Sequence, residues 1–252
     1  MNRYFIYLTY NGTRYCGWQN QPNGVSVQCC LEDALSKVLC RDIQIVGAGR
    51  TDAGVHARIM VAHFDAPEVI DNSAFIVGKL NNMLSKDIAV NKIVPVKEDA
   101  HARFSALSRT YIYMVSEKKD PFIHEYVCRM SLNRINFDTM NYACKTLTDY
   151  SDFTSFSKLH TDVKTNNCRI YEAGWTKHDD IWIFTIKADR FLRNMVRAIV
   201  GTLFEIGRGK ISVDDLRNII EAKNRGRAGM SVPAEGLALT DIEYPENIFH
   251  DF

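Results

Sequence analysis

Apolar and polar residues alternate along the N-terminal part of the chain in a pattern that predicts short strands separated by amphipathic helices. Residues 3–10 (RYFIYLTY) are β-branched and aromatic, without a breaker, and they predict a buried strand. Ser26 precedes apolar residues at helical spacing, so it predicts the cap of a helix that ends near Cys40. The other predicted elements are strands over residues 43–49, 59–66 and 88–96 and a helix over residues 72–84. This succession is typical of a split β-α-β unit.

The C-terminal part has similar content, although it shows no residue-level repeat. It includes a hairpin with an acidic turn at 178–180, a long apolar helix that ends at Gly207 and a helix capped by Ser212. The predicted elements are strands over residues 110–116, 169–177, 181–188 and 236–244 and helices over residues 136–147, 191–207 and 212–223. We therefore expect an α+β fold of two ferredoxin-like (RRM-like) α/β halves, residues 1–118 and 119–252, packed tightly without a flexible linker. Their mainly antiparallel sheets are expected to meet across a central basic cleft.

Composition places the chain among ordinary globular proteins. Of its 252 residues, 46% are hydrophobic and 24% are charged. No apolar run approaches the roughly 20 residues of a membrane span, and the first residues lack the pattern of a signal peptide. We therefore expect a cytoplasmic protein that does not enter a membrane. Seven scattered cysteines without a CxxC pair argue against a disulfide framework or a zinc site, so reduced thiols, mostly in the core, are expected.

Charge is distributed unevenly although the formal net charge is only +1. Residues 187–227 carry ten Lys and Arg against five Asp and Glu, whereas the residues after Arg227 carry acids and no Lys or Arg. A near-neutral total argues against a protein that binds nucleic acid with its whole surface. The basic stretch is either a local anion-binding face or an ordinary solvated face.

The stretch GAGRTDAGVHA, residues 47–57, lies between two predicted strands and combines Arg50, Asp52 and His56 with three glycines. Glycines allow a tight loop to present a carboxylate and a guanidinium to a ligand. The alternative is a glycine-rich turn in which Asp52 caps its own backbone. The spacing excludes a dinucleotide fingerprint, which needs a third glycine where Asp52 stands, and a phosphate loop, which needs a Gly-Lys-Ser/Thr ending.

The residue types around this loop limit the chemistry that it supports. A metal site would draw on Asp52, His56, His63, Asp65 and His101, but no HExxH motif or tight ligand cluster is present. No cysteine lies in a glycine elbow, and no second acid stands on a comparable loop as a glycoside hydrolase would need. The chemistry that remains is that of a single carboxylate, Asp52, beside arginines. Because a neighbouring cation favours its ionised form, it suits a nucleophile or a group that stabilises positive charge on a sugar ring.

GRTDAGVHA resembles the signature loop of the TruA-type tRNA pseudouridine synthases, and the resemblance extends along the chain. The other matching blocks are YNGTRYCGWQNQ (10–21), SVQCCLEDAL (26–35), VAHFDA (61–66), HARFSALSRTYIY (101–113), SDFTSF (151–156), FLRNMVRAIVGTLFEIGRGK (191–210) and PAEGLAL (233–239). Ordered blocks over most of the chain make the resemblance specific. It implies conversion of uridine to pseudouridine at positions 38, 39 and 40 in the anticodon stem-loop of tRNA, by a homodimer without metal or cofactor.

The resemblance also implies roles for individual residues. Asp52 matches the catalytic aspartate that assists cleavage of the N-glycosidic bond, and Tyr111 matches the tyrosine that stacks on the uracil and takes a proton from it. Arg50 matches the arginine expected to fill the gap left by the flipped nucleotide. Arg197, on the predicted helix, is the expected partner of Asp52, with Arg193 as the alternative. The cations expected to hold tRNA phosphates are Arg103, Arg109, Arg193, Arg208, Lys210, Arg225 and Arg227.

The sequence departs from the family pattern at residues 58–60, 149–151 and 230–232, where tRNA contacts and target positions are most open to change. Two rival hypotheses remain. One is a catalytically silent tRNA-binding or tRNA-folding protein on the same scaffold. The other is a metal-dependent hydrolase built on His56 and on the two histidines at 63 and 101.

Overall fold

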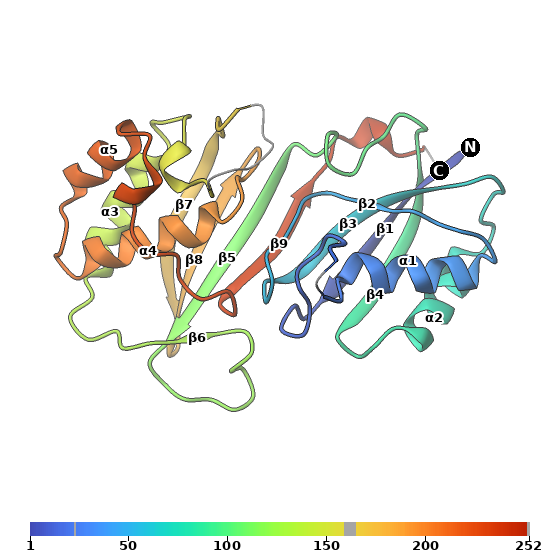
Figure 1. The fold of residues 1–252 in the computed structure, drawn as a ribbon, viewed down its shortest axis with the longest axis horizontal. Coiled ribbons are helices and arrows are strands. Elements are labelled where there is room, and N and C mark those ends of the chain that lie inside the picture. Colours follow the sequence, from blue (N-terminus) through green and yellow to red (C-terminus); the bar gives the residue numbers. More distant parts are fainter. Residues whose placement is uncertain (23, 159–164, 251–252) are drawn as a thin grey trace. The chain divides into compact units, whose positions relative to one another are not determined.

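The computed structural model describes residues 1–22, 24–158 and 165–250. The chain divides into two compact units (Figure 1), which we call unit 1 (Met1–Leu107 and Leu239–Phe252) and unit 2 (Ser108–Ala238). This division differs from the predicted one between residues 118 and 119. The strand that follows Leu107 pairs along its whole length with a strand of unit 2, so the change of unit precedes it.

Unit 1 contains a split β-α-β arrangement. Its elements are β1 (Asn2–Tyr10), α1 (Val27–Val38), β2 (Val46–Gly47), β3 (His56–Ala66), α2 (Ser73–Met83) and β4 (Ile88–Val96). β1 lies between β3 and β4 and pairs antiparallel with both, while β2 pairs antiparallel with the other side of β3. β9 (Leu237–Glu243), most of which belongs to unit 1, also follows β3 in the strand order. The helices α1 and α2 lie side by side (Figure 1).

Side chains define where the elements of unit 1 begin and end. Ser26 caps α1 as predicted, because its hydroxyl accepts the N–H of Cys29. The strand predicted over 43–49 is reduced to two residues. The N–H of Ile43 bonds the hydroxyl of Ser36, and that of Ile45 bonds the carboxylate of Glu32, so side chains of α1 take the place of a strand partner.

Unit 2 contains a second group of strands and helices. They are β5 (Ser108–Ser116), β6 (Cys128–Arg129), α3 (Phe137–Leu147), β7 (Ile170–His178), β8 (Ile181–Ala188), α4 (Met195–Gly207) and α5 (Val213–Glu221), with short 3₁₀ turns at Thr154–Phe156 and Arg225–Arg227. β8 pairs antiparallel with β5 and with β7, whereas β6 pairs parallel with β5. The mixed, mostly antiparallel strands and the helices beside them confirm the α+β class.

The helix predicted to start at residue 191 starts at Met195, so the predicted start is wrong. Asn194 takes a left-handed conformation with φ of 64°, which interrupts a helix. The carbonyl of Arg193 accepts the N–H of Lys158 at 3.1 Å instead of continuing the helical ladder. Arg193 therefore lies before α4. The cap predicted for α5 is confirmed, because Ser212 and Asp215 form a reciprocal capping box.

In each unit, an asparagine side chain forms hydrogen bonds with the main chain of an edge strand. Asn81 of α2 accepts the N–H of Val90 in β4 at 2.7 Å and donates to its carbonyl at 2.8 Å. Asn141 of α3 bonds the N–H and carbonyl of Trp175 in β7 in the same way, at 2.6 and 3.0 Å. Edge strands present unpaired main-chain groups to other chains. The two amides occupy such groups, and each comes from the helix that precedes the strand it protects.

Two expectations from composition can be compared with the structure. No helix in the described ranges is long and apolar enough to span a membrane. All seven cysteines lie in those ranges as free thiols, but only Cys128, Cys144 and Cys168 are buried. The expectation that most of the thiols lie in the core is therefore wrong.

Candidate functional site

The loop that contains Arg50 and Asp52 joins β2 to β3 and is closed by main-chain hydrogen bonds. The N–H of Ala48 donates to the carbonyl of Val61 at 2.7 Å, and the N–H of Val55 donates to the carbonyl of Asp52 at 3.1 Å. The buried hydroxyl of Thr51 lies 2.9 Å from the hydroxyl of Tyr10 in β1. The loop is thus anchored to both neighbouring strands, so its side chains are presented from a fixed backbone.

The segment between β1 and α1 that contains Gly12 and Gly17, which we call the glycine segment, packs against this loop. A Cβ at Gly12 would overlap the carbonyl oxygen of Val55, and a Cβ at Gly17 would overlap that of Thr51. Gly17 also has φ of 104°, which favours glycine. The N–H of Trp18 donates to the carbonyl of Thr51 at 3.3 Å. From the sequence, this block matched the family but had no predicted role; Gly12 and Gly17 are the residues that permit its close approach to the loop.

The two charged side chains of the loop differ in their exposure to solvent. Thr51 is buried, Asp52 is half-buried and Arg50 is exposed. The main chain of Asp52 closes the turn through Val55, so this bond does not require the carboxylate. A half-buried carboxylate suits contact with a reacting atom, whereas an exposed arginine suits contact with a large substrate.

The three histidines of the metal hypothesis serve as hydrogen-bond acceptors for the main chain. Nδ1 of His56 accepts the N–H of Gly12 at 3.0 Å, and Nδ1 of His63 accepts that of Ala102 at 3.1 Å. Nδ1 of His101 accepts the N–H groups of Arg103 and Phe104 at 3.1 and 3.3 Å. Within the described ranges no group of three or more His, Cys, Asp or Glu side chains is placed to hold a metal.

We expect His63 to make the stability of the protein depend on pH. Burial, helped by the charges of His101 and Arg3, lowers the pKa of His63 from 6.5 to about 4. Between these values the unfolded chain binds a proton that the folded chain does not, so the free energy of unfolding falls as the pH falls. We expect a loss on the order of 2 kcal/mol from this residue, measured by urea unfolding at pH 7 and pH 4.5.

His63→Asn is the matched variant for this prediction, because it keeps an acceptor for the N–H of Ala102 but does not titrate. Its stability should change less between the two pH values than that of the wild type. An unchanged pH dependence would show that other groups, such as Asp65 with its lowered pKa, account for the acid sensitivity.

Tyr111 lies on β5, paired with Ile186 of β8, and its side chain is mostly buried. The ring of Phe191 packs edge-on against it with centroids 5.1 Å apart. This contact fixes the orientation of the tyrosine ring. Arg109, two residues earlier on β5, donates through Nη1 to the carbonyl of Asp189 at 2.8 Å. Phe191 was not predicted as a site residue; the sequence placed it only at the start of the predicted helix and of a matching block.

Arg197 lies on α4 and is fastened to the segment that precedes β9. Its Nε donates to the carbonyl of Val232 at 2.7 Å, and its own carbonyl accepts the N–H of Val232 at 3.2 Å. Arg225 holds the same segment, because Nη1 donates to the carbonyl of Gly229 at 3.1 Å and Nη2 donates to Ser231 at 3.0 Å. The guanidinium of Arg225, which was predicted to bind a phosphate, thus donates hydrogen bonds to its own chain.

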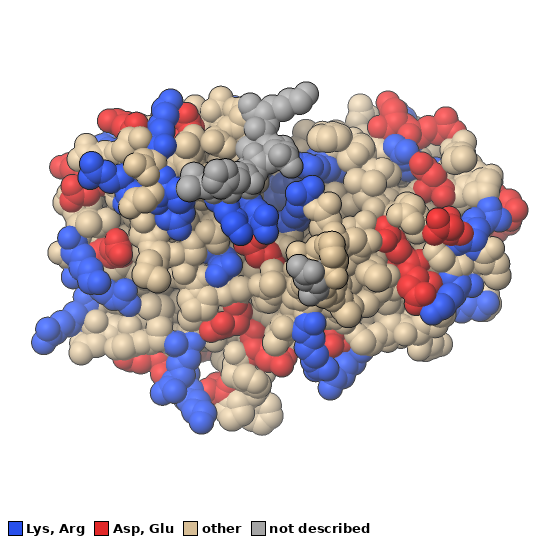
Figure 2. Space-filling view, in the orientation of Figure 1, with Lys and Arg blue, Asp and Glu red and all other residues tan. Residues whose placement is uncertain are grey.

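The other predicted phosphate-binding cations are exposed. They are Arg103 in unit 1 and Arg193, Arg208, Lys210 and Arg227 in unit 2. Lys and Arg side chains gather around α4 on the face shown in Figure 2, where acidic side chains are interspersed. The basic stretch found in the sequence therefore contributes charge to the surface of unit 2.

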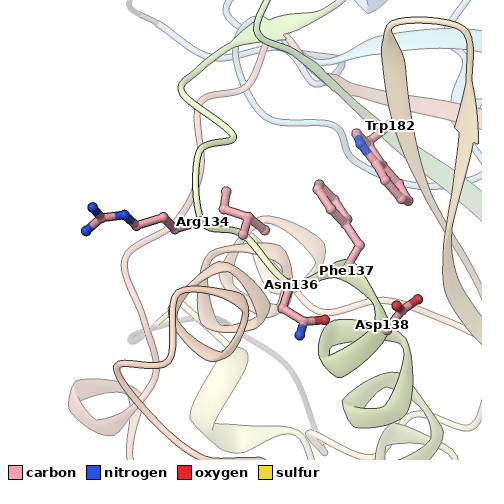
Figure 3. Close-up of a pocket in the computed structure, with 6 residues that line it drawn as sticks. Arg134, Asn136, Phe137, Asp138 and Trp182 are labelled. Carbon is pink, nitrogen blue, oxygen red and sulfur yellow. The ribbon is translucent and has the colours of Figure 1, made fainter.

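A hollow of about 480 Å³ in unit 2 contains none of the predicted site residues. It is lined by Arg134, Ile135, Asn136, Phe137, Asp138 and Trp182. The rings of Phe137 and Trp182 lie parallel with centroids 3.6 Å apart, and Figure 3 shows the side chain of Arg134 pointing away from them. Because the two rings stack on each other, no base fits between them.

A model of the family described as tRNA pseudouridine synthase matches residues 6–105 and 143–245. The first stretch contains the Arg50–Asp52 loop and the glycine segment that holds it. The second stretch contains Arg193, Arg197 and the segment around Val232. Tyr111 lies between the two stretches.

Curated relatives match almost the whole chain. The tRNA pseudouridine synthase A of Parabacteroides distasonis is 62% identical over 249 residues, which cover 99% of this chain and 98% of the relative. That of Bacteroides fragilis is 58% identical over 253 residues, covering 99% of each. That of a Geobacter species, strain M21, is 39% identical over 244 residues, covering 96% and 98%. Among solved structures, a Cbf5-Nop10-Gar1 complex is similar with a TM-score of 0.38 and 11% identity over 94% of this chain and 48% of that one, a distant likeness.

Proposed function

The chain belongs to the tRNA pseudouridine synthases, enzymes that isomerise uridine in tRNA, and from that premise we propose that it modifies uridines 38, 39 and 40 of the anticodon stem-loop. The bond between N1 and C1′ breaks, the uracil turns, and a bond forms between C5 and C1′. The proton on C5 leaves to solvent and N1 gains one, so the step needs no oxidant or reductant. We propose that it also needs no metal or cofactor.

We propose that Asp52 assists cleavage of the glycosidic bond. The observation that carries this assignment is the matched loop, in which a half-buried carboxylate stands on a backbone fixed by Val61, Tyr10 and Trp18. A fixed carboxylate favours the transition state because no reorganisation is needed when positive charge develops on the ribose. Arg197 is proposed as the partner of Asp52, with Arg193 as the alternative.

We propose that Tyr111 stacks on the uracil and that Arg50 fills the gap that the flipped nucleotide leaves. Flipping a base out of a stem costs a few kcal/mol, and an aromatic stack contributes roughly 1 to 3 kcal/mol per base. The edge-on contact with Phe191 supports this role, because it prevents the tyrosine ring from turning freely. The exposure of Arg50 supports its proposed contact with the tRNA stem.

Binding of tRNA is proposed to rest on the exposed cations, Arg103, Arg193, Arg208, Lys210 and Arg227, with Arg109 and Arg225 as further candidates from the sequence. Phosphate contacts of this kind weaken steeply as salt rises. A cytoplasmic homodimer and a basic cleft between two ferredoxin-like halves are part of the proposal. The near-neutral net charge of +1 favours a groove composed from two subunits over a uniformly basic surface.

Tritium release tests the proposed function. The wild-type protein is incubated with tRNA that carries tritium at C5 of uridine, and release to water is measured beside tRNA binding. We expect release with turnover, because C5 loses its hydrogen when it joins the ribose. Binding without release would favour the catalytically silent scaffold, and neither binding nor release would contradict both.

A further inference from the structure

The turn at residues 101–105 of unit 1 exposes an aromatic ring. Phe104 is 76% exposed, whereas Ala102, two residues earlier, is completely buried. Exposure of a large apolar side chain forfeits the free energy that its burial would contribute. Single exposed apolar residues are common on protein surfaces, so the exposure alone assigns no role.

The ring is held in a column of aromatic side chains. Phe104 lies against the imidazole of His101 with centroids 4.3 Å apart, and His101 lies against His63 with centroids 4.5 Å apart. His63 belongs to β3 and is buried. The exposed phenyl ring is therefore supported from beneath by the sheet.

The turn that carries the ring is itself rigid. Nδ1 of His101 accepts the N–H groups of Arg103 and Phe104. The hydroxyl of Ser105 accepts the N–H of His101 at 2.9 Å, and the N–H of Ser105 donates to the carbonyl of His101 at 2.9 Å. Four hydrogen bonds within five residues reduce the conformational freedom that a partner would otherwise have to remove on binding.

A cation lies over the exposed ring. The guanidinium of Arg103 lies over the ring of Phe104, 5.6 Å from its centroid, and both residues remain exposed. A rigid aromatic face next to an exposed arginine fits one unstacked base and the phosphate that follows it. An apolar segment of a protein would instead place its side chains against a guanidinium and an imidazole.

We propose that Phe104 is a stacking platform for an unpaired base of the tRNA and that Arg103 binds the adjacent phosphate. This inference rests on the proposed function, since it takes tRNA as the ligand, and it adds a contact that the resemblance did not assign. Phe104 binds and orients the substrate; the isomerisation itself takes place at Asp52. Loss of the ring therefore weakens binding and raises KM, while kcat changes little.

Phe75 provides a matched control. It is 56% exposed on α2 of the same unit, and Nζ of Lys79 lies 4.5 Å from its ring centroid. It therefore has a similar ring and a neighbouring cation, but it has no aromatic column beneath it in the described contacts. The variants Phe104→Ala, Phe104→Trp, Phe75→Ala and Phe75→Trp form the set to be measured.

Three measurements on these variants test the inference. Phe104→Ala should weaken tRNA binding about 5- to 150-fold, which corresponds to one stacked base. Phe104→Trp should bind like the wild type, and its added tryptophan emission should be quenched by tRNA. Neither Phe75 variant should show either effect, and urea unfolding should give similar stability for all four.

The outcomes distinguish failure of the stacking platform from failure of the proposed function. Wild-type affinity of Phe104→Ala, or unquenched emission of Phe104→Trp, with an active wild type would overturn the platform and leave the proposed function intact. Unchanged tRNA affinity with an altered sedimentation coefficient would identify the ring as a protein contact and overturn it too. A wild type that neither binds tRNA nor releases tritium would remove both proposals.

Discussion

Asp52→Asn is expected to lower kcat for tritium release from uridine-labelled tRNA by roughly 10³-fold or more, because the variant lacks the carboxylate that we propose acts on the glycosidic bond. Asparagine has nearly the same shape. The loop should remain folded, since its closure uses the main chain at Asp52 and the hydroxyl of Thr51. Affinity for tRNA should stay within a few-fold of the wild type, so that the loss appears in kcat.

Asp33→Asn is the control for this variant. It removes one carboxylate of the same unit, which is 61% exposed on α1 and pairs with Lys37 of the same helix. Such exposed pairs contribute little to stability, so we expect wild-type activity and a wild-type urea midpoint. Comparable kcat values for Asp52→Asn and Asp33→Asn would remove Asp52 from the mechanism.

Gly17→Ala is expected to damage both stability and catalysis, although Gly17 belongs to the supporting segment. An alanine there is strained by φ of 104° and its Cβ overlaps the carbonyl oxygen of Thr51. We expect a loss of about 2 to 4 kcal/mol in the free energy of unfolding. Displacement of the neighbouring Asp52 should lower kcat by roughly 10²-fold, since misplacement by about 1 Å has effects of this size.

Two further variants serve as comparisons for Gly17→Ala. Gly49→Ala adds a methyl group to open space in the loop itself and should leave the urea midpoint unchanged. Tyr10→Phe removes the hydroxyl that bonds Thr51 and should cost about 1 kcal/mol. If Gly17→Ala has the stability and kcat of the wild type, the glycine segment does not hold the loop that contains Asp52.

Much of the fold follows from local patterns. Apolar runs and helical spacing located β1, β4, α2, α3 and α5 to within a few residues. Caps were equally readable where a side chain near in sequence bonds the helix end, as Ser26 and Ser212 do. These features depend on neighbours within a few positions, which a sequence displays directly.

The errors come from contacts between residues distant in sequence. The shortened β2 depends on Glu32 and Ser36, whose side chains bond main-chain groups at Ile45 and Ile43. The late start of α4 depends on Arg193, whose carbonyl accepts the N–H of the distant Lys158. Apolar periodicity contains no information about either effect.

In the candidate site, too, some features are visible in the sequence and others are visible only in the structure. The loop with Asp52 stood out because its residue types are unusual together, and the family comparison supports it. The support from Gly12 and Gly17, the ring of Phe191 against Tyr111 and the inward donors of Arg225 required coordinates. Charge alone did not separate Arg225, which holds its own chain, from exposed cations such as Arg227.

Mapping of the modified nucleotides tests the central claim most directly. A tRNA with uridines at 38, 39 and 40 is treated with the wild-type protein or with Asp52→Asn, and carbodiimide adducts that persist on pseudouridine are located by reverse transcription. We predict stops at these three positions with the wild type, no change in nucleotide mass, and none of these stops with Asp52→Asn. Absence of stops with the wild type, or identical stops with both proteins, would contradict the account.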